Sequence, residues 1–153
     1  MLPKWKIWFR SGLSATYEIA FLSIPIIVWV SAIISANPST DISKLVAWPF
    51  LALSMWGNGL RDSIRAFSSN PSQDKNVQGR EKYQREAMAA FSIVGLVFTC
   101  VLLTNTVLHS LGSLPNLWSP HWCLVWVSLA FSVGAAWIAK AILIQRNDYG
   151  HYV

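Results

Sequence analysis

The feature that most constrains the fold of this chain is a series of long apolar runs separated by short polar segments. The hydrocarbon core of a bilayer is about 30 Å thick, so a helix needs roughly 20 mostly apolar residues to cross it. We therefore predict an all-α polytopic membrane protein, a bundle of four transmembrane helices that forms a single membrane domain over residues 1–153. The spans are expected at about residues 15–36, 42–60, 87–111 and 121–144.

The composition agrees with lipid as the main solvent. Hydrophobic residues make up 54% of the chain and charged residues 12%, whereas soluble domains are roughly 25% charged. Nine Trp and seven Phe add to this signal, because aromatic side chains collect where lipid tails meet headgroups. An ordinary soluble domain is excluded.

The second predicted span is the least regular. It carries Lys44 near its start and Pro49 within it, and a Gly-Asn-Gly triplet lies near its end. A proline inside a helix removes a hydrogen bond, so Pro49 and Pro25 are each expected to kink their spans. Asp41 precedes Lys44 by three residues, a spacing that favours an ion pair at the start of this span.

Residues 61–86 form the only sizeable polar segment and predict a short helical hairpin in the cytoplasm. Opposite charges recur at helical spacing there, as in Lys82 with Glu86. Of the 12 Lys and Arg residues, all but Lys44 fall on one side of the predicted membrane. The positive-inside rule then puts both termini and the hairpin in the cytoplasm of a bacterial-type inner membrane.

Two charges inside spans predict an interhelical ion pair. Glu18 lies soon after the cytoplasmic start of the first span, and Lys140 lies one turn before the cytoplasmic end of the fourth. Lys140 also continues a ridge of small residues at four-residue spacing, which lets another helix approach closely. The ridge consists of Ser128, Ser132 and Ala136. The alternative for Lys140 is snorkelling, in which its long stem carries the ammonium to the headgroups.

Glu18 has a second interpretation as a proton-coupled carboxylate of an oligomeric transporter or channel. Small multidrug resistance transporters also have four spans and a glutamate in the first span. The resemblance consists of Glu18 preceded by Tyr17, and no other position aligns, so no family is assigned on it.

The histidines and cysteines do not predict a metal or a cofactor site. His109, His121 and Cys123 fall near one outer loop, but zinc normally takes at least three protein ligands, and interfacial hydrogen bonding is the simpler role for the histidines. Histidines placed to hold haem are lacking. Cys100 and Cys123 are expected as separate buried thiols at different depths.

The sequence carries no catalytic motif, so we predict that the chain is not an enzyme. The basic residues flank apolar runs and form no single soluble face, which argues against nucleic-acid binding. The predicted function is that of a small inner-membrane accessory protein that docks to a membrane-protein partner or to a second copy. Exclusion and immunity factors of mobile elements share this layout. The predicted docking charges, whose alternative role is that of a solvated connector, are Arg61, Arg65, Arg80, Lys82 and Arg85.

Overall fold

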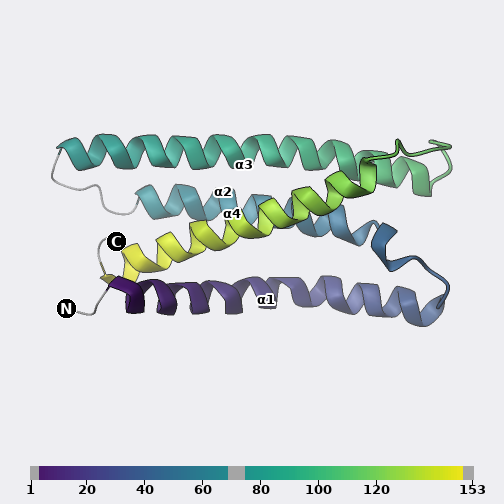
Figure 1. The fold of residues 1–153 in the computed structure, drawn as a ribbon, viewed down its shortest axis with the longest axis horizontal. Coiled ribbons are helices and arrows are strands. Elements are labelled where there is room, and N and C mark those ends of the chain that lie inside the picture. The colour runs from purple at the N-terminus through teal and green to yellow at the C-terminus, as the bar shows by residue number, and fades with distance from the viewer. Residues whose placement is uncertain (1–3, 69–74, 150–153) are drawn as a thin grey trace.

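The protein is built from four long helices in the computed structural model, which describes the backbone of residues 4–68 and 75–149 and the side chains of residues 5–66, 82–84 and 86–144. The helices are α1 (Lys4–Ala36), α2 (Ala47–Ser68), α3 (Lys75–Ser110) and α4 (His121–Tyr149), with a short 3-10 turn, η1 (Ile42–Lys44), before α2 (Figure 1). The all-α prediction is confirmed for these residues.

Three of the helices are long and apolar enough to cross a membrane, over Trp5–Ala36, Lys82–Ser110 and His121–Ile144. Helix α2 is not among them, because its second half carries Asn58, Arg61, Asp62 and Arg65. Its place in the molecule accounts for this composition. In Figure 1, α1 and α3 form opposite flanks, and α2 and α4 lie between them.

Helix α2 packs most extensively on α4 and also contacts α3, while α1 packs mainly on α4. The main apolar core joins Ile26 and Val30 of α1 to Leu51 and Met55 of α2 and Ala136 of α4. A helix that neighbouring helices shield from lipid needs fewer apolar residues than one that faces lipid all round.

The start of α2 differs from the prediction. Helix α2 begins at Ala47, whereas the span was expected from Ile42. Asp41 caps the start of η1, where its side chain accepts a hydrogen bond from Ser43 N at 3.1 Å, and the backbone is extended at Leu45 before α2 begins. The predicted Asp41 to Lys44 ion pair is confirmed, with Oδ2 and Nζ 2.9 Å apart. Pro49 lies in the first turn of α2, where no backbone donor is needed, so the predicted kink there is wrong.

The polar hairpin is helical on both sides of residues 69–74, since α2 continues to Ser68 and α3 starts at Lys75. The predicted turn falls outside the described residues. Cys100 and Cys123 are free, as expected, but both are exposed, so their predicted burial is wrong. They lie on faces of α3 and α4 that the described part of the chain does not cover.

Candidate functional site

The most charged site of the described interior is centred on Lys140 of α4. Its Nζ lies 2.8 Å from Glu18 Oε2 of α1 and 2.9 Å from Asp62 Oδ2 of α2. One ammonium therefore connects three helices. The Lys140 side chain is 11% exposed and the Asp62 side chain 2%, while that of Glu18 is 53% exposed. Both carboxylates are within hydrogen-bonding distance, so the ammonium is satisfied where it lies without extending to the headgroups.

A fourth charge completes the cluster. The other Asp62 oxygen, Oδ1, accepts a hydrogen bond from Arg61 Nε at 3.0 Å. The two cations and two anions balance, which lowers the free-energy cost of burying Asp62. We call Glu18, Arg61, Asp62 and Lys140 the charge belt.

Asp62 is the member that the sequence analysis does not single out, because it lies in the polar segment 61–86 that predicts a cytoplasmic hairpin. A signal was present: Met55, Gly59, Asp62 and Ala66 recur at spacings of four and three, the pattern of one helix face. All four are buried in the structure.

Next to the charge belt, the ring of Trp137 packs across α1. Trp137 Nε1 donates to Thr16 Oγ1 at 3.1 Å. A Cβ added at Gly12 would lie 2.8 Å from Trp137 Cζ2, so the indole in this position leaves no room for a side chain at residue 12. The hydrogen bond and the ring contact hold α1 and α4 together beside the ion pair.

The small-residue ridge of α4 faces α2, whereas its spacing predicted a close helix neighbour without specifying which helix. Ser128, Ser132 and Ala136 are 5%, 0% and 3% exposed. A Cβ on Gly59 of α2 would lie 3.3 Å from the Ala136 backbone nitrogen, so the two backbones approach closely. Small residues permit this approach and strengthen helix packing in lipid.

A chain of hydroxyl hydrogen bonds links α2, α4 and α3. Trp56 Nε1 donates to Ser128 Oγ at 3.3 Å, and Ser128 Oγ lies 2.6 Å from Thr99 Oγ1. Because Thr99 donates its own hydrogen to Gly95 O at 2.7 Å, we assign Ser128 as the donor to Thr99. The polar side-chain atoms of Trp56, Ser128 and Thr99 therefore all have hydrogen-bond partners within the apolar interior.

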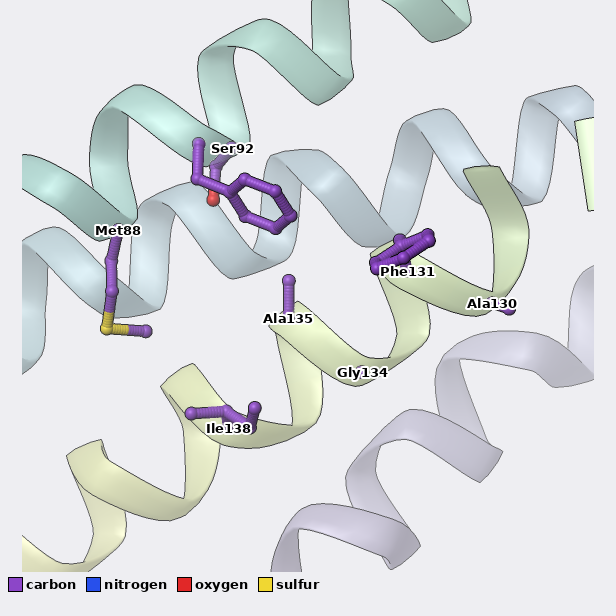
Figure 2. Close-up of a pocket in the computed structure, with 8 residues that line it drawn as sticks. Met88, Ser92, Ala130, Phe131, Gly134, Ala135 and Ile138 are labelled. Atoms are coloured by element: carbon purple, nitrogen blue, oxygen red, sulfur yellow. The ribbon is translucent and has the colours of Figure 1, made fainter. Parts of the chain in front are cut away.

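An apolar groove lies between α3 and α4 on one side of this hydroxyl chain. Its cavity volume is about 420 Å³, and a second cavity of about 210 Å³ shares Phe91 and Phe131 with it. Figure 2 shows Met88 and Ser92 on α3 across from Ala135 and Ile138 on α4. A Cβ added at Gly134 would meet no atom within 4 Å. We call this cavity pair the α3–α4 groove.

His121 and His109 make separate hydrogen bonds. His121 Nε2 lies 2.9 Å from Thr106 Oγ1, and His109 Nδ1 lies 2.9 Å from Leu114 O. No group of three metal-binding side chains occurs among the residues that the structure describes.

The predicted docking charges do not form one site in the described part of the chain. Arg61 belongs to the charge belt, Arg65 is exposed on α2, and Lys82 Nζ lies 3.9 Å from Glu86 Oε1. The side chains of Arg80 and Arg85 fall outside the described residues.

Comparison of the chain with protein-family models, with curated proteins and with solved structures finds no match.

Proposed function

We propose that this protein is a small, non-enzymatic accessory protein of a bacterial-type inner membrane, which crosses the bilayer four times and docks laterally onto another membrane protein. Its termini and the polar hairpin lie in the cytoplasm in this proposal. The positive-inside rule supports that orientation, because Lys44 is the one basic residue assigned to the outer side.

The charge belt supports four crossings by marking the cytoplasmic edge of the hydrocarbon core. Residues 19–36 of α1 and residues 121–139 of α4 carry no Asp, Glu, Lys or Arg, and at 1.5 Å per residue they are about 27 and 28 Å long. Each length matches a core of about 30 Å. Because Asp62 binds Lys140 directly, the part of α2 around Asp62 lies at the same level. The segment from Asp41 through η1 and α2 to Asp62 then runs from the outside to the inside.

The α3–α4 groove is the observation that carries the docking proposal. Small residues at Ala130, Gly134 and Ala135 line its α4 side, and Phe91 and Phe131 line both cavities. From Met88 to Phe98 it follows α3 for about 15 Å at 1.5 Å per residue, or nearly three helical turns. We propose that an apolar partner helix packs there, with large side chains filling the space beside Gly134.

The transporter alternative gains less support from the same geometry. Glu18 is paired with Lys140 between α1 and α4, and the described cavities are lined almost entirely by apolar side chains. A proton-coupled carboxylate would need a water-accessible path through the protein.

The experiment is co-purification from native membranes in mild detergent, comparing wild type with Gly134→Leu and Gly57→Leu. The leucine side chain that Gly134→Leu introduces would fill the groove without displacing any atom within reach of its Cβ. Gly57 is the matched control, because a Cβ there also meets nothing within 4 Å and the residue lies outside the groove.

We expect a specific partner with wild type and Gly57→Leu, and its loss with Gly134→Leu at unchanged accumulation. Recovery of the partner with all three proteins would reject the groove as the docking site. Charge reversal of Arg80, Lys82 and Arg85 then tests the polar hairpin as the alternative. Recovery of the protein only with itself would favour a self-assembled channel, with Glu18→Gln as the next variant.

A further inference from the structure

The first turns of α1 extend beyond the bilayer in the proposed orientation. Helix α1 has 33 residues and is therefore about 50 Å long, whereas a whole bilayer with its headgroups is about 40–45 Å thick. Trp5 precedes Glu18 of the charge belt by 13 residues, or about 20 Å. One headgroup layer accounts for only about 5–8 Å of that distance.

In the proposed orientation, this extension leaves large, exposed apolar side chains beyond the hydrocarbon core. Trp5 and Phe9 are 65% and 66% exposed, and Leu13 continues the same row at four-residue spacing with 46%. The other side of the helix is buried against the bundle, as Ile7 and Ser11 are 6% and 0% exposed. Contiguous apolar side chains exposed outside the membrane mark a contact surface.

Two exposed basic residues indicate what the surface contacts. Lys6 and Arg10 lie beside the aromatic row, and neither has an ion pair within the described side chains. Lys6 Nζ lies 5.5 Å from the Trp5 ring centroid, a cation–π contact that leaves the ammonium able to bind an anion. An acidic partner surface matches this charge, whereas a second copy in parallel would bring Arg10 close to its equivalent.

We propose that Trp5, Lys6, Phe9 and Arg10, which we call the α1 tip, bind an acidic amphipathic helix in the cytoplasmic part of the membrane partner. Its apolar side covers Trp5 and Phe9, and its carboxylates pair with Lys6 and Arg10. The inference rests on the proposed docking function and adds a second, cytoplasmic contact to it.

The test is photo-crosslinking in native membranes, with the photoreactive amino acid p-benzoylphenylalanine replacing Phe9. The matched control carries it at Ile7, two residues away on the buried side of the same helix. We expect an adduct from position 9 and none from position 7. Mass spectrometry should map the adduct to a helical partner segment with acidic residues. Reversal by Lys6→Glu with Arg10→Glu should lower its yield by at least about tenfold, because each charge contact becomes repulsive.

An adduct with phospholipid alone would assign the α1 tip to the membrane surface and overturn the inference. An adduct with a second copy, with a partner segment lacking acidic residues, or with a yield unchanged by the charge reversals would overturn it as well. If a partner co-purifies but position 9 gives no adduct, the inference fails and the docking function stands. If neither a co-purifying partner nor an adduct is found, both fail.

Discussion

Asp62 of α2 lies 2.9 Å from Lys140 of α4, and it also accepts a hydrogen bond from Arg61. The Asp62 side chain is 2% exposed. A buried carboxylate that loses its cation retains the full cost of its desolvation, so this pair makes the fold sensitive to changes at Lys140.

Lys140→Met should reduce accumulation and lower the free energy of unfolding by about 3–5 kcal/mol, because Asp62 then retains only Arg61 as a partner. Thermal unfolding of the purified protein in detergent measures the change. The double variant Asp62→Leu with Lys140→Met should recover part of the loss, since neither charge then remains buried. A double variant that is no more stable than Lys140→Met would contradict this account.

Glu18→Gln should be much milder, by about 0–1 kcal/mol, because a half-exposed partner contributes little. The same thermal measurement compares it directly with Asp62→Asn. If Glu18→Gln were the more damaging of the two, the assignment of Asp62 as the main partner of Lys140 would be wrong.

Gly95→Ala should destabilise the packing of α2 on α3 by about 1–3 kcal/mol, since the added methyl would overlap the Trp56 ring. Gly134→Ala is the control, because its methyl meets no atom within 4 Å. That control should be neutral or stabilising by up to about 1 kcal/mol from helix propensity. Equal effects of the two variants would argue against the close approach of Trp56 to Gly95.

Cysteine accessibility tests whether α2 crosses the membrane. In a background with Cys100→Ser and Cys123→Ser, a membrane-impermeant maleimide should label Ser39→Cys from the outside of intact cells. Tyr83→Cys should react only after the membrane is opened. Both positions are accessible in the structure, Ser39 and Tyr83 being exposed, so burial does not prevent their reaction. Labelling of the two positions from the same side would exclude a crossing by α2.

The turn before α2 should respond to acid. Hydrogen bonding from Ser43, followed by the contact with Lys44, lowers the pKa of Asp41 from its usual 3.8 to about 2. The folded state therefore favours the charged form. The contribution of Asp41 is fully present above pH 3.8 and is lost as the pH falls through about 2. Thermal midpoints of wild type and Asp41→Asn should differ at pH 6 and converge near pH 2; a constant difference would contradict the lowered pKa.

The sequence by itself determined the helical class and the three apolar helices. Each of these helices leaves much of its surface uncovered by the rest of the described chain. A helix suited to lipid must itself be apolar, so the signal is local. The close match in depth of Glu18 and Lys140 also indicated a pair, and their side chains lie 2.8 Å apart in the structure.

Only the tertiary structure decided the place of α2 and the partners of its polar residues. Helix α2 is shielded by its neighbours, so its sequence is mixed and its hydropathy does not reveal its role. Local sequence predicts a solvated Asp62, because the charge that satisfies it, Lys140, lies on another helix. The fit of Gly59 against Ala136 likewise depends on two segments far apart in the chain. Contacts of this kind follow from helix packing, which local composition does not specify.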